Sequence, residues 1–482
     1  MGFNNSLFVF AFMPFSMVFS LILYYISKRI KIIEKLRIWD ISIIIMSLSF
    51  YAWAFWGDVL FLICFIIFVF FVGKLIERLK SADVEGQNKR SFKDAISVLL
   101  LIAIIILIVT IIIFKYLKGL SDSKVEFLNS IVTPIGISFI TFSGISYLVD
   151  TYKGEHAGNI IDVALYISFF PKVVSGPIIL WKEFNNNIKS RKIDSSTLSN
   201  AIVEIVIGFF KKIVIADYFG QVISQISVSN ITQGVAWLIA LLYMFQIYFD
   251  FAGYSNIAIG LSRFMGFSFD SNFKFPYIST SITEFWRRWH ITLGIWFKTY
   301  IYIPLGGNRK GKRRTLINNM IVMLISGVWH GVGLNYILWG ILHGVCVVFE
   351  KATEKNSFFC RIPSLIKWAV TMFVVMIGWE LFRTESLAEF MVFIKKLIGV
   401  GVSSSPTFTL RYYLTTKMIV MIIIAIIGST LMCFIIDSTP IKKFTKMKGF
   451  EVIKYIVVLC LLLVVLTSIV NSTYSPFIYF QY

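Results

Sequence analysis

Three of the four histidines in this 482-residue chain lie within one stretch, from His290 to His343. Two of them stand in similar frames, W-R-R-W-H at 286–290 and G-V-W-H-G at 327–331. The sequence around them is strongly apolar, and an ionisable group at membrane depth is costly unless it serves a function. Histidine titrates near neutrality and transfers protons readily. The pattern therefore indicates proton-transfer chemistry inside a membrane protein.

The spacing of two histidines limits what they can do together. His330 and His343 are 13 residues apart in the apolar run 319–349. If this run is one helix, they lie about 20 Å apart along its axis and point about 140° apart around it, so they cannot serve one substrate atom. A break at Gly331 and Gly333 would remove this restriction. We expect His330, near the middle of the run, to be catalytic and His343 to be mainly structural.

A second segment, 284–300, mixes charged and aromatic residues. Glu284 and Arg288 are four residues apart and can pair along one helix face. The segment is consistent with a helix that lines a wet chamber, and equally with an interfacial helix whose arginines reach the headgroups. The loop that follows, 304–314, combines Gly-Gly-Asn turn chemistry with five basic residues, which favours a cytoplasmic loop over a phosphate-binding one.

These residues must be positioned by membrane helices. The chain is 57% hydrophobic and only 15% charged, and a spanning helix needs about 20 mostly apolar residues. The sequence therefore predicts an all-α polytopic membrane protein, with re-entrant or interfacial helices near 160–180 and 284–305 around a central catalytic cavity. Roughly eleven runs are long enough to be spans: 7–26, 41–55, 58–73, 95–114, 131–149, 201–218, 235–261, 319–349, 366–382, 417–436 and 452–470.

The character of the chain changes along its length, although we expect one integral membrane domain over residues 1–482. Residues 1–120 are strongly apolar and are predicted to be flanking helices. In 131–344, proline, glycine and polar residues interrupt the apolar runs. Non-helical backbone at membrane depth survives only where it is buried or lines a cavity, so this part is the predicted catalytic core. Residues 345–482 are predicted to be C-terminal flanking helices.

The distribution of positive charge predicts sidedness. Basic residues gather in the loops at 28–37, 74–93, 309–314 and 442–448. Loops rich in Lys and Arg remain in the cytoplasm. We therefore expect these loops to be cytoplasmic and both termini to lie outside.

Several kinds of chemistry find no support in the sequence. The net charge of +20 is spread over membrane loops, so it does not indicate a nucleic-acid partner. No G-x-S-x-G motif suggests a serine acyl-enzyme. The cysteines form no C-x-x-C pair and predict neither a disulfide framework nor a metal site; they are Cys64, Cys346, Cys360, Cys433 and Cys460.

Seven segments, in order along the chain, resemble the membrane-bound O-acyltransferase family. The closest branch is the alginate O-acetyltransferase group, and the Y-I-P-L-G-G-N-R stretch favours it over the branch that transfers D-alanine to teichoic acid. The segments are PIGISFITFSGISYLVDTYKG at 134–154, FFPKVVSGPI at 169–178, QIYFDFAGYSNIAIG at 246–260, EFWRRWHITLGIWFKTYIYIPLGGNRKG at 284–311, GVWHG with WGILHG at 327–344, GWELFR at 378–383 and SPFIYFQY at 475–482.

The resemblance implies acyl transfer to a hydroxyl, with His330 at the position of the catalytic base and His290 at the second active-site position. A positioned base strengthens a hydroxyl nucleophile and contributes about 10²–10⁴ in rate. His290 or the neighbouring arginines could stabilise the oxyanion. Asp250 either orients a histidine or forms a polar cavity wall, or else serves as the structural partner of a buried arginine. The candidate substrate-binding residues are Arg287, Arg288, Asp250, Trp329 and Asn335.

The resemblance also implies the substrates and their setting. The leading interpretation is an O-acetyltransferase of a bacterial cell membrane that modifies an extracellular or cell-wall polysaccharide. Its donor would be a cytoplasmic thioester, acetyl-CoA, used as a substrate with no bound cofactor. An extracytoplasmic partner protein would complete the transfer. Two alternatives remain: transfer of D-alanine or another acyl group to teichoic acid or lipid, and a transporter or flippase for a lipid-linked sugar.

Overall fold

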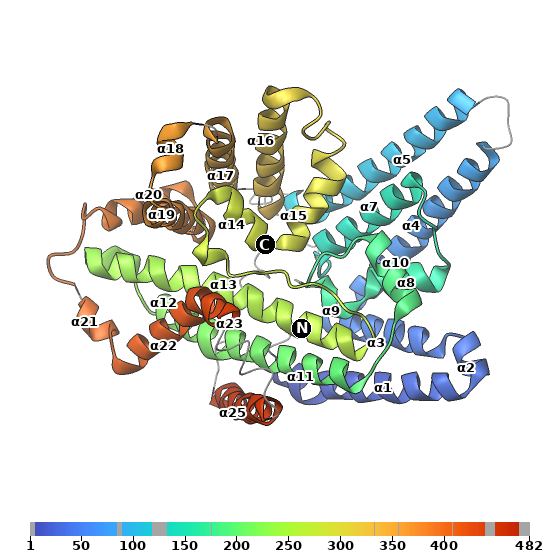
Figure 1. Ribbon diagram of the computed structural model, residues 1–482, viewed down its shortest axis with the longest axis horizontal. Helices are drawn as coiled ribbons and strands as arrows, with labels where there is room; N and C mark the ends of the chain where they lie inside the picture. The colour runs from blue at the N-terminus through green and yellow to red at the C-terminus, as the bar shows by residue number, and fades with distance from the viewer. Residues whose placement is uncertain are drawn as a thin grey trace. The chain divides into compact units, whose positions relative to one another are not determined.

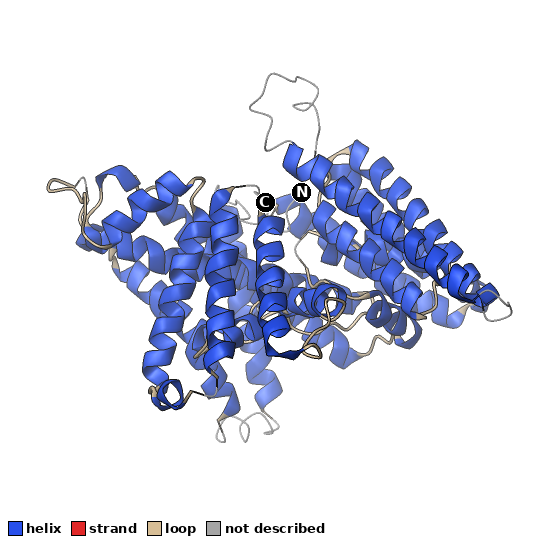
Figure 2. Ribbon diagram, turned by 90° about the horizontal axis from the view of Figure 1, so that it is seen from above, coloured by secondary structure: helices blue, strands red, loops and turns tan. Residues whose placement is uncertain are grey.

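The protein was described from a computed structural model that covers residues 5–83, 89–117, 133–174, 176–331, 333–354, 356–406, 408–438 and 449–471. Within these ranges every regular element is helical and no strand is present (Figure 2). The basic cluster at 442–448, the segment 475–482 and the C-terminal end predicted to lie outside fall beyond the described residues.

The predicted polytopic all-α architecture is confirmed. Among the described residues, 8 helices are long and apolar enough to cross a membrane. A shorter apolar helix covers 38–53, and the predicted run at 131–149 corresponds to a helix of 17 residues, Ile137–Lys153. The predicted run at 201–218 lies within continuous helical structure over 195–224, but it contains Glu204, Lys211, Lys212 and Asp217 and is not among the candidate spans. The candidate spans are Phe8–Arg29, Trp56–Ala82, Asp94–Tyr116, Gln233–Phe264, Leu334–Thr353, Ser364–Arg383, Thr416–Ile436 and Phe450–Val470.

The chain divides into two compact units. Unit 1 comprises Met1–Ile205 with Ile257–Asp270, and unit 2 comprises Val206–Asn256 with Ser271–Tyr482. In unit 1, helices α4 (Trp56–Asp83), α5 (Lys89–Ile111) and α7 (Ile137–Lys153) pack side by side (Figure 1). The remaining helices of this unit are α1 (Met13–Arg29), α2 (Lys31–Lys35), α3 (Ile38–Ala54), α8 (Ile160–Ser168), α9 (Phe170–Val173), α10 (Trp181–Ser190) and most of α11 (Ser195–Phe209).

Two basic clusters of unit 1 lie at the same end of it. Arg37 of the first cluster pairs with Asp162 of α8, at 2.6 Å. Lys80 of the second cluster donates to the carbonyl of Tyr152 in α7, at 2.6 Å. Because a short connection joins α7 to α8, these contacts bring the loops at 28–37 and 74–83 to one end of the unit, in agreement with the shared side that their charge predicts.

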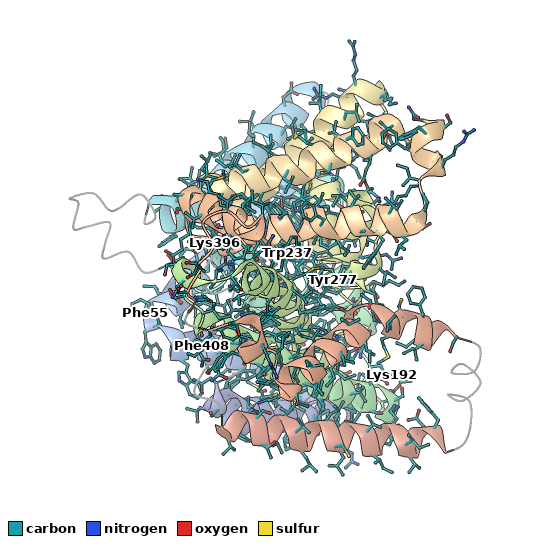
Figure 3. All side chains as sticks on the ribbon, turned by 90° about the vertical axis from the view of Figure 1, so that its left-hand side faces the viewer. Phe55, Lys192, Trp237, Tyr277, Lys396 and Phe408 are labelled. Carbon is teal, nitrogen blue, oxygen red and sulfur yellow. The ribbon has the colours of Figure 1, made fainter. Side chains whose placement is uncertain are left out.

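Unit 2 is built around the part of α13 (Gln233–Phe264) that ends at Asn256. The most apolar window of α13 is 89% buried. The hydroxyl of Tyr277 donates to the Met244 carbonyl of α13 at 2.5 Å. The indole of Trp237 donates to the Leu397 carbonyl at 3.0 Å, beside Lys396 (Figure 3). These bonds tie α13 to the segment after Ser271 and to α20 (Leu387–Leu397). The other long helices are α16 (Gly311–His330), α17 (Leu334–Thr353), α19 (Ser364–Arg383), α22 (Thr416–Ile426) and α25 (Phe450–Asn471).

The interpretation of 319–349 as one helix is wrong. Helix α16 ends at His330, and α17 begins at Leu334 and runs back beside it (Figure 1). The break lies at the glycines that the sequence offered as its position. Small residues allow the two helices to touch, since a Cβ on Gly327 would lie 2.5 Å from the carbonyl oxygen of Tyr336. The hairpin therefore returns to the end at which it began.

Candidate active site

The two short helices α14 (Ile282–Arg288) and α15 (Ile291–Phe297) meet at a sharp turn. Its pivot is His290, which adopts φ 46° and ψ 53° in the left-handed region. Such backbone is uncommon outside glycine and often marks a functional site. At the other end of α14, the Glu350 carboxylate accepts from the backbone N–H groups of Ile282 at 2.6 Å and Thr283 at 2.8 Å. Both ends of the helix that presents the W-R-R-W-H residues are thus held in place.

Asn272 determines which nitrogen of His290 carries the proton. The Oδ1 of Asn272 accepts from the backbone N–H of Thr292 at 3.1 Å, so this atom must be the amide oxygen. The same oxygen lies 3.2 Å from Nδ1 of His290, which must therefore be the donor. Nε2 is left with a lone pair, and it is buried without a hydrogen-bond partner among the described residues. Burial lowers the pKa of His290 to about 3, so the ring is neutral near pH 7.

His290 lines a cavity of about 470 Å³. An adjoining cavity of about 740 Å³ shares Thr283, Arg287, Asn308 and Lys351 with it. Residues Gly311 and Lys312 of the basic loop line this outer cavity. The two cavities thus connect the basic loop to His290. Charged residues that line one or both are Arg287, Lys298, Lys312, Glu350, Lys351 and Glu354.

The α16–α17 hairpin brings His330 and His343 against the same tryptophan. The ring centroids of His330 and Trp339 are 5.1 Å apart, and those of His343 and Trp339 are 4.9 Å apart. The separation of about 20 Å that one continuous helix would impose on His330 and His343 therefore does not apply. His330 is 5% exposed and packs on Phe382, with ring centroids 5.0 Å apart. Of the three described histidines in this region, His290 is the one that lines the cavity.

Comparison with known proteins identifies the family. A profile described as MBOAT, membrane-bound O-acyltransferase family, matches residues 48–382, more than half of the chain. This chain belongs to the membrane-bound O-acyltransferase family. It is therefore an O-acyltransferase of the membrane, and the family favours acyl transfer over the transporter alternative.

Three relatives illustrate the range of this acyltransferase family. The chain is 38% identical over 407 residues to the probable alginate O-acetylase AlgI of Pseudomonas syringae pathovar tomato, covering 80% of this chain and 73% of the relative. It is 32% identical over 447 residues to the peptidoglycan O-acetyltransferase of Helicobacter pylori, covering 83% and 80%. It is 33% identical over 250 residues to the teichoic acid D-alanyltransferase of Streptococcus thermophilus, covering 48% and 59%. The resemblance found in the sequence is confirmed.

The two adjacent arginines of this acyltransferase have different surroundings. Arg287 lines both cavities. Arg288 pairs with Glu284 at 2.9 Å, as the spacing predicted, and also donates to the carbonyl of Lys274 at 3.1 Å. Arg287 is thus placed to meet a substrate, whereas Arg288 holds α14 to the preceding segment.

Asp250 lies in a buried ion cluster. Its carboxylate is 2.6 Å from Nζ of Lys212, which also lies 2.6 Å from Asp217. The sequence suggested a histidine or an arginine as the partner of Asp250, whereas the ion pair seen in the structure is with a lysine. The ion pair with Lys212 joins α13 to the π-helical segment at 210–216.

Two further candidates flank the hairpin turn. The ring centroids of Trp329 and His330 are 4.5 Å apart, so Trp329 packs directly on the predicted base. The amide of Asn335 donates to the carbonyls of Leu381 at 3.2 Å and Thr384 at 2.7 Å. Asn335 therefore joins the start of α17 to the end of α19.

Sequence reasoning missed three residues of the site. Asn272 orients His290, Glu350 caps α14, and Lys351 lines both cavities. Asn272 stands in a polar stretch that carries no motif. The sequence does place Glu350 and Lys351 at the end of the 319–349 run, but only the reversal of α17 brings them beside α14.

Proposed function

We propose that this acyltransferase moves an acetyl group from a cytoplasmic thioester donor to a hydroxyl of an extracellular or cell-wall polysaccharide. The two relatives matched over most of both chains are named as O-acetylating enzymes of alginate and peptidoglycan. The observation that carries the proposal is the unpaired Nε2 of neutral His290 on the wall of a cavity that extends to a basic outer chamber.

The outer chamber suits a donor that carries phosphates. Three basic residues, Arg287, Lys312 and Lys351, and two acidic residues line the outer cavity. Guanidinium and ammonium groups are the usual partners of phosphate oxygens. The volumes are typical of pockets that hold small molecules. We therefore propose acetyl-CoA as the donor, with its phosphates near Lys312 and Lys351 and its thioester near His290.

The transfer follows from the chemistry of these groups. The acceptor hydroxyl oxygen attacks the thioester carbon and the hydroxyl proton passes to a histidine. The carbon–sulfur bond then breaks, and the donor leaves as a thiol after its sulfur takes that proton. We assign the base to His330, following the family resemblance. Neutral His290 offers a hydrogen-bond acceptor at Nε2, so we assign it to orienting the acceptor through a second hydroxyl, which leaves the proton of the attacking hydroxyl to His330. Arg287 is then the candidate donor to the oxyanion, because its guanidinium lines the cavity beside His290.

The acceptor requires a second component. A polysaccharide outside the cell cannot enter a cavity of this size as a whole chain, so an extracytoplasmic partner protein is proposed to take the acetyl group onward. We also propose that the chain resides in the bacterial cell membrane with both termini outside. Transfer of D-alanine is the alternative, supported by a relative of that name that is matched over about half of this chain.

Analysis of surface esters tests this function. Cells that lack the chain would be complemented with the wild type, His290→Ala or His330→Ala, and esters would be released from their polymers with mild alkali. The expected result is full release of acetate with the wild-type chain, a reduced amount with His290→Ala and little or none with His330→Ala. Release of D-alanine instead would support the alternative, and no change in either ester would contradict acyl transfer to a surface polymer.

A further inference from the structure

A separate polar cavity lies in unit 1, where the first candidate span ends. It measures about 270 Å³ and is lined by the end of α1, by α2, by the start of α3 and by the C-terminal part of α10. None of its residues belongs to the acyl-transfer site described above. Six of the lining residues are charged: Lys28, Glu34, Arg37, Asp40, Lys189 and Arg191.

The charges of this cavity do not cancel. Lys28 pairs with Glu34 at 3.1 Å, Arg191 pairs with Asp40, and Arg37 contacts both Asp40 and Asp162 of α8. Lys189 makes no ion pair with a described residue. The lining therefore has an excess of positive charge and a free ammonium group at its edge, which favours an anionic ligand.

Arg191 is held rigidly in the wall of the cavity. Its guanidinium lies between two rings, 4.4 Å from the centroid of Trp39 and 4.9 Å from that of Phe267. The side chain is 7% exposed, and its Nη1 is buried without a hydrogen-bond partner among the described residues. A stacked, pre-oriented guanidinium with an unused donor is suited to binding a phosphate oxygen.

The segments around this cavity are of the kind found at a membrane surface. The candidate span Phe8–Arg29 ends beside it. In the short helix α2 and its flanks, Ile30, Ile32 and Leu36 are 45%, 65% and 56% exposed. These apolar side chains alternate with lysines, as in segments that lie between the headgroups and the hydrocarbon. A ligand in the cavity would thus have both headgroup and acyl-chain neighbours.

We propose that this cavity binds the phosphate of an anionic lipid headgroup, with the acyl chains of that lipid packing over the exposed apolar residues of α2. Arg191 and Lys189 supply the donors to the phosphate. This would make unit 1 a specific lipid anchor at the end that carries the two basic loops, independent of the acyl-transfer chemistry of unit 2.

Native mass spectrometry of the full chain with phosphatidylglycerol would test the proposal. Lys189→Glu reverses a charge that lines the cavity, while Lys192→Glu reverses an exposed charge nearby that does not line it (Lys192 is labelled in Figure 3). Retained phosphatidylglycerol should fall several-fold in Lys189→Glu and stay at the wild-type amount in Lys192→Glu. Equal losses in the two variants would overturn the proposal, because they would indicate a general effect of surface charge.

Two further measurements separate the sources of the phosphate. Phosphatidylcholine should be retained less than phosphatidylglycerol by the wild type, and inorganic phosphate at millimolar concentration should not displace the lipid. Displacement by inorganic phosphate would identify a site for soluble phosphates and overturn the lipid assignment. Arg191→Lys keeps the positive charge but loses the planar guanidinium stacked between Trp39 and Phe267, so it should weaken lipid retention. Retention at the wild-type amount would contradict the role of Arg191. Thermal unfolding of each variant verifies that it is folded.

Discussion

At His290, one amide oxygen decides which ring nitrogen can take part in chemistry. Because the oxygen of Asn272 also accepts from the backbone of Thr292, it cannot rotate away without breaking that bond. Nδ1 of His290 is therefore held as a donor, and Nε2 remains an acceptor. A neutral histidine in this form can hold a hydroxyl but cannot donate to an oxyanion, which is why Arg287 receives that role in the proposed mechanism.

Removal of the Asn272 oxygen should therefore impair catalysis. In Asn272→Ala, His290 loses its orienting partner, and we expect the acetylation rate to fall about 10- to 100-fold, the scale seen when metal-bound histidines lose their hydrogen-bond partners. In Asn272→Asp, the added carboxylate would favour the imidazolium and raise the pKa of His290. Activity should then be lost at a higher pH as the solution is acidified. The pH–rate profiles of both variants provide the measurement; a wild-type profile for Asn272→Ala would exclude this role.

The three histidines should differ when each is replaced by alanine. We expect His330→Ala to lower transfer by about 10²–10⁴, the contribution of a general base, and His290→Ala to lower it less completely. His343 is buried between Trp286 and Trp339, so His343→Ala should mainly lower stability. The measurement is O-acetyl formed per folded protein in each variant. If His343→Ala is as inactive as His330→Ala while His290→Ala is unaffected, the assignment is wrong.

The adjacent arginines provide a matched comparison. Arg287→Ala removes a charge from both cavities and should raise KM for acetyl-CoA and lower kcat. Arg288→Ala breaks the partly exposed pair with Glu284, and such pairs contribute about 0.2–1 kcal/mol. Its kinetic constants should stay near those of the wild type. The measurement is steady-state kinetics with membranes of matched protein content. Equal KM and kcat values for the two variants would contradict the assignment of Arg287 to the substrate cavities.

At the scale of elements, composition predicted most of the membrane helices but not their reversals. Apolar runs such as 417–436 coincide with candidate spans almost to the residue, because hydrocarbon demands continuous helix. The run 319–349 contained no charged residue to reveal its turn. Gly331 and Gly333 offered a possible break in the sequence, but only the packing of Gly327 against the following helix establishes the reversal. An apolar run thus predicts helix, whereas tertiary contacts determine whether it crosses or folds back.

The sequence likewise revealed only some of the residues of the candidate site. His290 and Arg287 could be found because histidine and arginine are rare in apolar sequence and stand in a recognisable frame. Asn272 could not, because an asparagine in a polar connection has many ordinary roles. Asp250 and Asn335 were singled out by their polarity in apolar surroundings, yet each bonds to a neighbouring helix. Polar residues at membrane depth therefore indicate importance, but not whether they bind substrate or hold helices together.

The glycine contact between α16 and α17 can be tested directly. In Gly327→Ala, the new Cβ would meet the carbonyl of Tyr336, and overpacking of this kind costs about 1–3 kcal/mol. Since α16 carries His330 and α17 carries Trp339, activity should fall together with stability. Gly449→Ala is the control, because nothing lies within 4 Å of its Cβ position. Thermal unfolding in detergent gives the measurement, and equal melting temperatures of the two variants would contradict close packing at Gly327.

At the scale of the whole molecule, the proposed function requires access from both sides of the membrane. The donor is made in the cytoplasm, while the proposed acceptor lies outside. The outer chamber of the site is lined by residues of the basic loop at 309–314, which the charge rule predicts to be cytoplasmic. The donor would therefore enter from that side, and the acetyl group would cross within the protein while its carrier remained in the cytoplasm.

Single-cysteine labelling of intact cells tests this sidedness. The five native cysteines are first replaced, since none forms a disulfide. A cysteine at Gly311, which is exposed beside the outer chamber, should resist a membrane-impermeant thiol reagent until the cells are opened. Cysteines at Ser6, exposed at the start of the described chain, and at Ser472, which lies outside the described residues, should react at once. If Gly311 is labelled from outside, the donor cannot enter through the basic chamber, and transfer across the membrane in the proposed direction is excluded.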